Sequence, residues 1–449
     1  MRNSFFYIVF SFFIILTIVS CQNDDAPVVY EKGTNEYINQ WTWSQMKKYY
    51  YWNNEMPQKT DISLPPKDYF AGLVSDSDPY SYIFNSQLPE TSPKNLRKQF
   101  GFEISFVEYN GQVLGAILYV LTDSPAKRSG LKRGQYITHI NGTKLDQSNF
   151  DGLYNNLVAS AQAQLTIKNY TEALGFSVPQ EISISRGFTF SQPVFTSVIT
   201  EGSTRVGYIE IPHFDIHQAG IFMNAFQNFK SQSVNKVIID LRYNGGGDVS
   251  SASALCSILA PGISGDDMFI QFKGNSNGGV INQSFKEALM MNETTVSFDA
   301  LRNVHPEIDR VYILCGNNTA SASEIIINNL KPFMDVITIG EKTMGKDVAG
   351  FPIEDESDSG DNAWILYPAI YKLYNASGQG NYSSGIIPSV ILDELAQVEI
   401  FPLGDKRETL LKNALDILFR NGRTTEGKQL LKKLKNYPQP EPVSVQIKL

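Results

Sequence analysis

The residues from 191 to 420 alternate between patterns typical of buried strands and patterns typical of amphipathic helices. The strand-like runs include "RVGYIEI", "NKVIIDLRY", "RVYILCG" and "DVITIG", and helical runs such as "VSSASALCSILA" and "ASEIIINNLKPF" separate them. Strands that alternate with helices are typical of α/β domains. We therefore predict an α/β core over residues 191–420, closed by the amphipathic helix "KRETLLKNALDILFRN".

The 449-residue chain is too long for one hydrophobic core, so we expect further domains outside this segment. Residues 35–96 place aromatic and apolar side chains at helical spacing, which predicts a small N-terminal helical domain. After the core, "GKQLLKKLKNYPQPEP" within residues 421–449 predicts a basic, solvent-exposed helix followed by a Pro-rich tail.

A β-rich segment lies between these parts. The runs "FGFEISFVEY" and "QVLGAILYVL" are typical of strands, and Asn110-Gly111 between them is a signal for a tight hairpin. The series "SPA…SGLKRG…I…ING" that follows resembles a PDZ domain, which we place at residues 97–170. Residues 171–190 would then connect this domain to the core.

PDZ domains bind a peptide as an added strand, and the resemblance implies where that peptide would lie. The "FGF" run resembles the loop whose backbone amides bind a peptide's C-terminal carboxylate, and the helix over residues 149–160 would line the groove. The peptide-binding residues implied are Phe100, Gly101 and Phe102. The alternative is another small β-rich domain in which Gly101 is only a turn residue.

The first residues have the layout of an export signal. One Arg precedes an uncharged run from Phe5 to Val19, and small residues lead to Cys21, which predicts a signal peptide over residues 1–20. "IVSC" resembles the lipobox of bacterial lipoproteins, so we expect lipid on Cys21, a polar tether over residues 21–34 and anchoring in the cell envelope. Gln22 resembles residues that permit sorting to the outer membrane of a Gram-negative bacterium. An uncleaved anchor with a chance cysteine is the alternative.

Charge and metal-ligand patterns narrow the possible partners. The net charge is −8 with Lys and Arg scattered, so a nucleic-acid partner, which needs a basic face, is not expected. His213 and His217 lie four apart, but neither HExxH nor CxxC accompanies them, so we predict no metal and no other cofactor. Cys256 and Cys315 stand in apolar runs and are predicted to be small buried residues, with a disulfide as the alternative.

Three short stretches of the core carry the candidate chemistry. In "IIDLRYNGGGDVSSA" three glycines follow a strand, which lets the backbone approach a ligand, although the turn could serve packing alone. In "NNTASASEIIINNL", Ser321 and Glu324 fit a capping box, but a Ser at a helix N-terminus also has the layout of a nucleophile. "GEKTMGKD" nearly matches a phosphate-binding loop, but Asp347 replaces the hydroxyl residue and Gly350 and Pro352 follow, so no nucleotide is expected.

Together these stretches resemble the C-terminal processing, or tail-specific, serine peptidases. Residues 240–247 match the family's "DLR-x-N-x-G-G", residues 319–324 its "[ST]ASASE", and Lys346 the Lys of "T-x-G-K". The spacing from Ser321 to Lys346 is also that of the family, and "GIIPSVIL" resembles its later "GI-x-PD". The resemblance implies a ClpP/crotonase-like α/β peptidase core behind a helical cap and a PDZ-like domain.

The resemblance also implies the roles of individual residues. Ser321 would be the nucleophile and Lys346 the general base, since a lysine works as a base only when neutral and an apolar pocket favours that form. The amides of Ala322 and Gly246 would form the oxyanion hole, with Glu324 and Gly247 in support.

The expected function is an exported serine endopeptidase that cleaves unfolded or C-terminally recognised proteins through an acyl-enzyme. One departure from the family pattern is Gly350, which stands where active relatives usually carry a Gln that places the Lys. The alternative function is therefore a weakly active or inactive peptide-binding lipoprotein on the same scaffold.

Overall fold

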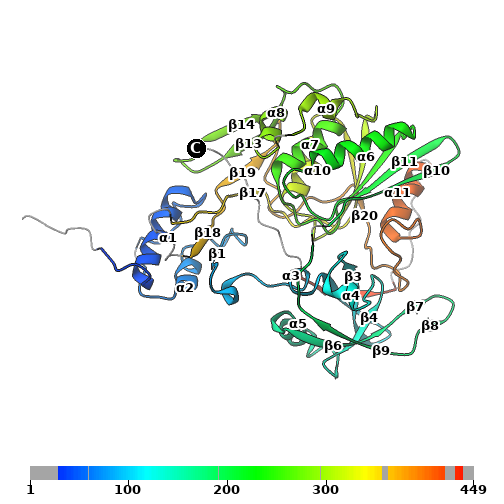
Figure 1. Cartoon of the computed structure of the whole chain (residues 1–449), viewed down its shortest axis with the longest axis horizontal. Helices are drawn as coiled ribbons and strands as arrows, with labels where there is room; N and C mark the ends of the chain where they lie inside the picture. Colours follow the sequence, from blue (N-terminus) through cyan, green and yellow to red (C-terminus); the bar gives the residue numbers. More distant parts are fainter. Residues whose placement is uncertain are drawn as a thin grey trace, which may run out of the picture.

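The computed structural model describes residues 29–58, 60–190, 192–293, 295–355, 363–419 and 430–437. Figure 1 shows three parts: an N-terminal unit on the left, a β-rich unit at the bottom and a larger α/β core above both. The predictions made for residues 1–28, including lipidation of Cys21, lie outside the described residues. Within the described residues no helix is long and apolar enough to cross a bilayer.

The core is built on a six-stranded sheet in which only the first pair of strands is antiparallel. Its order is β10 (Phe195–Glu201), β11 (Thr204–Glu210), β12 (Lys236–Asp240), β15 (Arg310–Cys315), β16 (Asp335–Gly340) and β20 (Val390–Ile391). The α/β prediction for this segment agrees with the sheet, because its parallel strands are joined through helices.

Helices cover both faces of this sheet, which explains why its strands are almost continuously apolar. One face carries α6 (Ala219–Ser231), α7 (Val249–Leu259) and α10 (Ala322–Leu330), which pack on buried residues such as Ile239 and Ile313. The opposite face carries α11 (Thr409–Phe419), which packs on Ile238 and Leu314.

A smaller antiparallel sheet extends the core. Its order is β14 (Val280–Ser284), β13 (Met268–Lys273), β19 (Tyr371–Tyr374) and β17 (Val348–Ala349), and α8 (Phe285–Met290) and α9 (Phe298–Arg302) lie near it. The run "AWILYPAIYKL", which has the pattern of one strand, is two strands that belong to different sheets. Pro368 lies between them and has no backbone N–H to continue a ladder.

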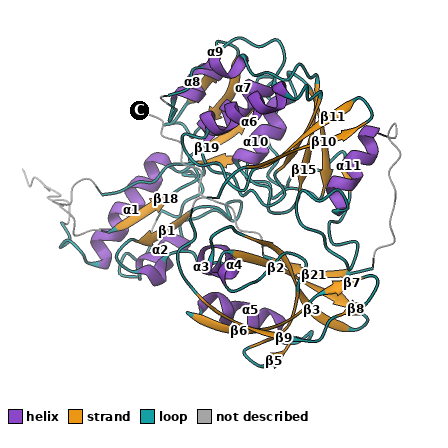
Figure 2. Cartoon of the chain, turned by 45° about the vertical axis from the view of Figure 1, so that its right-hand side comes forward, coloured by secondary structure: helices purple, strands orange, loops and turns teal. Residues whose placement is uncertain are grey.

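The N-terminal unit is not purely helical. It contains α1 (Asn35–Tyr49), α2 (Pro66–Ala71), β1 (Tyr82–Asn85) and the short 3₁₀ helix η1 (Pro89–Thr91). Strand β1 pairs antiparallel with β18 (Trp364–Tyr367), so this unit shares a two-stranded sheet with a late segment of the core (Figure 2).

The β-rich unit follows the predicted hairpin closely. Strands β2 (Phe102–Tyr109) and β3 (Gln112–Val120) are joined at Asn110 and Gly111, whose φ angles of 49° and 75° are those of a tight hairpin turn. The other elements are α3 (Leu96–Phe100), α4 (Pro125–Arg128), β4 (Tyr136–Ile140), β5 (Thr143–Lys144), α5 (Phe150–Ala159), β6 (Gln162–Lys168), β7 (Tyr170–Thr171), β8 (Gly175–Phe176) and β9 (Gln180–Ser185).

Two predictions about segments that join this unit are wrong. Strand β9 pairs with β6, so the sheet continues through the predicted connector at residues 171–190. The predicted basic helix after residue 421 is, in its described part, the strand β21 (Lys432–Asn436), which pairs antiparallel with β2. The exposed edge of β2 gives this segment backbone partners that its local sequence does not indicate.

The predicted state of two cysteines agrees with the structure. Cys256 lies in α7 and Cys315 in β15, and both thiols are free and buried. Burial raises the pKa of each thiol above its ordinary value. Both therefore behave as small apolar residues of the core.

Candidate active site

The three stretches singled out in the core meet at the carboxyl ends of β12, β15 and β16. The Ala320 amide donates to the Asn244 carbonyl at 3.1 Å, and the Ser323 hydroxyl donates to the same oxygen at 3.0 Å. The Met344 amide donates to the Thr319 carbonyl at 3.0 Å. The serine-containing turn is therefore held between the glycine-rich turn and the loop that carries Lys346.

Ser321 has a backbone conformation that serine rarely adopts. Its φ of 57° and ψ of −117° lie outside the ordinary α and β regions, just before the first residue of α10. The residue is fully buried, and its Oγ has no hydrogen-bond partner in the described part of the chain. A strained residue with an unpartnered hydroxyl is typical of a functional position.

Glu324 connects the serine turn to the lysine loop. Its Oε2 accepts from the Ser321 amide at 2.9 Å and from the Lys346 amide at 2.8 Å. Its Oε1 accepts from the Thr343 hydroxyl at 2.5 Å and from the Gly345 amide at 2.7 Å. Burial raises the pKa of Glu324 to about 7, although these four hydrogen bonds favour the charged form.

Lys346 lies in a buried loop rather than at the start of a helix. The side chain lines a cavity of about 30 Å³, and its Nζ is 5.8 Å from the centre of the Tyr80 ring. Gly345 has a φ of 95°, and a β-carbon there would lie 2.4 Å from the Ser383 carbonyl oxygen. Strand β17 follows, so the loop lacks the helix N-terminus on which a phosphate-binding loop depends.

The glycine turn passes directly against the serine turn. A β-carbon on Gly246 would lie 2.7 Å from Ser321 Cβ and 3.0 Å from the Ala322 nitrogen, so only glycine fits. Ala322 begins α10, and its amide therefore has no helical carbonyl to bind. The Gly246 amide instead donates to Asn244 Oδ1 at 2.9 Å, so it is engaged in this conformation. Gly247 also requires glycine, because a β-carbon would meet the Phe214 carbonyl at 2.0 Å.

The position of Gly350, where the resemblance led us to expect a glutamine in active relatives, leaves no room for a side chain. A β-carbon at Gly350 would lie 2.0 Å from the Pro368 carbonyl oxygen. The backbone of Pro368 thus occupies the space that any larger side chain needs, and a glutamine cannot simply be restored there.

The predicted carboxylate-binding loop is closed in this structure. Phe100 and Phe102 are fully buried in the core of the β-rich unit. Gly101 has a φ of 81°, and its amide donates to the carbonyls of Leu96 and Arg97 as the C-cap of α3. This amide is consequently not available to a peptide carboxylate in the conformation described.

The "DLR" residues form a buried charge network beneath the site. Arg242 pairs with Asp240 at 2.9 Å and with Glu408 at 2.5 Å, and all three side chains are buried. These bonds connect β12 to α11, so the charges of this stretch support the fold rather than face the nucleophile.

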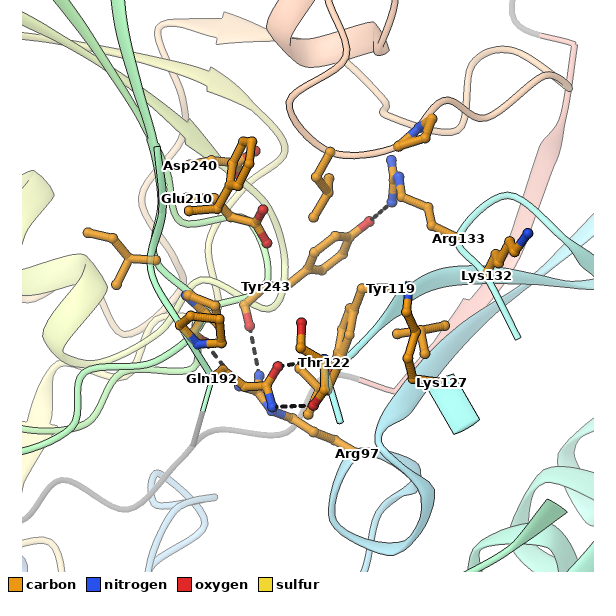
Figure 3. A pocket seen from close by; sticks show the side chains of 18 residues that line it. Arg97, Tyr119, Thr122, Lys127, Lys132, Arg133, Gln192, Glu210, Asp240 and Tyr243 are labelled. Carbon is orange, nitrogen blue, oxygen red and sulfur yellow. Dashed lines mark hydrogen bonds between the residues drawn. The ribbon is translucent and has the colours of Figure 1, made fainter. Parts of the chain in front are cut away.

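A larger cavity, of about 540 Å³, lies between the β-rich unit and the core (Figure 3). On one side Arg97 donates to the Tyr243 carbonyl at 2.9 Å and to the Pro212 carbonyl at 3.0 Å. None of the predicted catalytic residues lines it. The described residues also contain no cluster of His, Cys, Asp and Glu with the arrangement of a metal site.

Comparison with models of known protein families shows to which family the chain belongs. Residues 205–392 match the model "Peptidase family S41", and residues 37–82 match the model "Peptidase S41 N-terminal domain". The two matches together cover more than half of the chain. The chain belongs to peptidase family S41.

The curated relatives that match this S41 chain are named as proteases. It is 24% identical over 392 residues to the carboxy-terminal processing protease CtpB of Bacillus subtilis, spanning 86% of this chain and 74% of that protein. It is also 24% identical over 345 residues to a probable CtpA-like serine protease of Staphylococcus aureus, spanning 76% of this chain but 62% of that protein. The chain is thus a serine-type peptidase of the C-terminal processing group.

A solved structure resembles this S41 chain over most of its length. The crystal structure of a putative S41 protease from Bacteroides fragilis superposes with a TM-score of 0.68 at 25% identity. The match covers 88% of this chain and all of that one. The mixed α/β fold described above is therefore that of an S41 protease.

Some residues of the site were missed by sequence reasoning. Tyr80 reaches Lys346 from the N-terminal unit, and Asn244 and Thr343 hold the turns together. Thr343 stands within the matched "T-x-G-K", so its position in that pattern was the available signal. Tyr80 lies far from every recognised stretch, and no sequence pattern indicates it.

Proposed function

We propose that this chain is an endopeptidase in which Ser321 is the nucleophile and Lys346 its general base. The observation that carries the proposal is the shared carboxylate oxygen of Glu324, which fixes the backbones of both residues. The Lys346 amine would accept the Ser321 hydroxyl proton as Oγ attacks the peptide carbonyl. It would return that proton to the leaving amine, and water would then hydrolyse the acyl-enzyme.

The oxyanion of the tetrahedral intermediate would lie at the N-terminus of α10. The Ala322 amide supplies one donor there. Gly246, which touches the Ser321 side chain, supplies the second once its amide leaves Asn244 Oδ1. On this proposal the described conformation is a resting state, which fits the complete burial of Ser321.

The substrates proposed are unfolded proteins or protein C-termini, reached outside the cytoplasm. The export and lipid anchor rest on the sequence around Cys21, and peptide recognition by a PDZ-like unit rests on the resemblance together with its β-sheet and α5. The proposed location is the cell envelope, at an outer membrane.

A fluorophosphonate serine probe tests the catalytic proposal. Wild-type protein should be labelled on Ser321, identified by peptide mass spectrometry, and Ser321→Ala should not be labelled. Ser231→Ala is the control and should be labelled like wild type, since Ser231 is an exposed serine at the end of α6, outside the site. If no variant is labelled and no unfolded protein is cleaved, the peptide-binding alternative replaces the peptidase.

A further inference from the structure

The edge of the β-rich sheet is occupied by the chain's own late segment. Strand β21 runs antiparallel to β2, with Ser105 opposite Asn436, Phe106 opposite Lys435 and Glu108 opposite Lys432. Antiparallel addition to an edge strand beside a helix is the way an extended peptide binds such a sheet. Residues 432–437, which we call the strap, thus hold the place of a peptide ligand (Figure 2).

Side chains of the strap match the groove between β2 and α5. The Tyr437 ring stacks on Tyr154 of α5 with centres 3.6 Å apart and planes 7° apart. The Tyr437 hydroxyl also donates to Asp151, and Leu434 packs against the same apolar cluster. The groove thus accommodates an aromatic ring beside Asp151.

Two lysines of the strap pair with acidic residues of the groove. Lys432 Nζ lies 3.2 Å from Glu108 Oε2, and Lys435 Nζ lies 2.7 Å from Asp151 Oδ1. Solvent reaches both pairs and screens them, so each holds the strap only weakly. The strap is therefore complementary in charge to its groove but held by contacts weak enough to be exchanged.

A third lysine of the strap reaches the catalytic core instead. Lys433 Nζ lies 2.7 Å from Glu341 Oε1 and 3.0 Å from Asp393 Oδ1. Glu341 directly follows β16 and begins the loop that carries Lys346. One short strand thus contacts both the peptide groove and the start of the lysine loop.

We propose that the strap is an internal competitor of substrate, which a basic, aromatic-containing extended segment displaces from the β2–α5 groove. Displacement would break the Lys433–Glu341 pair and so couple recognition to the lysine loop. The ligand mode is internal rather than C-terminal, because residues follow Tyr437 in the chain and the Gly101 amide is engaged in the α3 cap. Only the effect on turnover rests on the proposed function; the binding step does not.

Peptide binding to the full-length Ser321→Ala protein tests the competition. The probe is a fluorescein-labelled peptide with the sequence of residues 430–438, measured by anisotropy. When Lys435→Ala and Tyr437→Ala are added to the chain, the labelled peptide should bind at least tenfold more tightly, because these changes weaken the strap that competes with it. A peptide with Glu in place of each Lys should not bind, and Asp151→Lys in the chain should abolish binding of the normal peptide.

The matched control is Arg310→Ala, which removes an equally exposed ion pair, to Asp335, between β15 and β16 of the core sheet. It should leave peptide affinity unchanged. Equal affinity for parent and strap variants, or binding that survives Asp151→Lys, overturns the proposal.

A second measurement separates this proposal from the catalytic one. With Ser321 intact, Lys433→Ala should raise the rate of probe labelling at Ser321 several-fold while the protein unfolds at an unchanged temperature. Unchanged labelling overturns the coupling. Complete absence of labelling in every variant instead counts against the peptidase, and leaves the anisotropy result to decide the competition.

Discussion

One oxygen of Glu324 accepts hydrogen bonds from the backbone amides of both Ser321 and Lys346, at 2.9 and 2.8 Å. The carboxylate thereby fixes the distance between two turns that are well separated in the sequence. A capping box has two hydrogen bonds, one to the side chain of each of its two residues. Here the Glu324 carboxylate accepts from the Ser321 amide, but Ser321 Oγ has no partner among the described residues.

Replacing Glu324 by Gln should therefore be costly. Each carboxylate oxygen accepts from two donors, so the NH₂ of Gln would face two N–H or O–H groups and leave them unsatisfied. We expect kcat to fall by about two orders of magnitude or more, because small misplacements of catalytic groups have effects of that size. Steady-state kinetics on an unfolded protein substrate would measure it. Wild-type kcat in Glu324→Gln would contradict the positioning role.

The pH dependence of activity should carry the signature of the same carboxylate. The pKa of Glu324 is raised to about 7 by burial, and only the ionised form can accept all four hydrogen bonds. As the pH falls through about 7 a proton would convert one acceptor into a donor, so kcat/KM should decline on the acidic side. A kcat/KM that stays flat from pH 8 to pH 5, for a substrate that does not titrate in this range, would argue against this.

Ser321→Ala and Lys346→Ala should each remove nearly all turnover, and the double variant should be no slower than either. Groups that act in one proton transfer are not additive, because losing either one loses the step. Lys342→Ala, on the same loop, is the matched control and should retain activity. Activity that survives in Lys346→Ala but disappears in a histidine variant would refute the dyad.

Gly350→Gln should lower stability and activity instead of restoring a family feature. The reason is the Pro368 carbonyl oxygen, which lies 2.0 Å from where the new β-carbon would be. We expect a loss of about 1–3 kcal/mol in unfolding free energy, as for other overpacked sites. Gly152→Gln, where the β-carbon would meet nothing within 4 Å, is the control for chemical denaturation.

Glu103 should make the β-rich unit less stable as the pH rises. Burial raises the pKa of this carboxyl to about 8, so the folded state binds a proton that the unfolded chain releases near pH 4.5. Its contribution is fully present below about pH 4.5 and is lost as the pH rises through about 8. Glu103→Gln should thus match wild type at pH 4.5 and melt at a higher temperature at pH 9. If the difference in melting temperature between Glu103→Gln and wild type does not change with pH, burial of the Glu103 carboxyl has no such effect on stability.

Cys21→Ala should abolish fatty-acid labelling of the protein in cells, given that the lipobox-like "IVSC" is the only basis for the anchor. Metabolic labelling with an alkyne fatty acid would measure it. Cys256→Ala should be labelled like wild type, because that thiol is buried in α7. Equal labelling of Cys21→Ala and wild type would refute the assignment.

Much of the core could be predicted because its information is local. Continuous apolar strands and amphipathic helices indicate their own secondary structure, and a parallel sheet brings successive strand ends together, which is why Gly246, Ser321 and Lys346 converge. The strap is the opposite case. "QLLKKLKNY" has good helix formers and becomes a strand only because β2, from a much earlier part of the chain, offers an open edge. The Pro368 carbonyl beside Gly350 is likewise a contact between strands that no local pattern encodes.

The pairing of β1 with β18 also has a consequence for the time at which the protein can first act. Tyr80, just before β1, lies against Lys346, and the sheet beside that loop is completed only by β20. A ribosome delivers these segments in order, so the first is made long before the last. When Ser321 has been made, Lys346 and β20 are still to come, so the serine lacks its working surroundings until the chain is nearly complete. The interlocking of early and late segments thus postpones a complete site to the last part of synthesis.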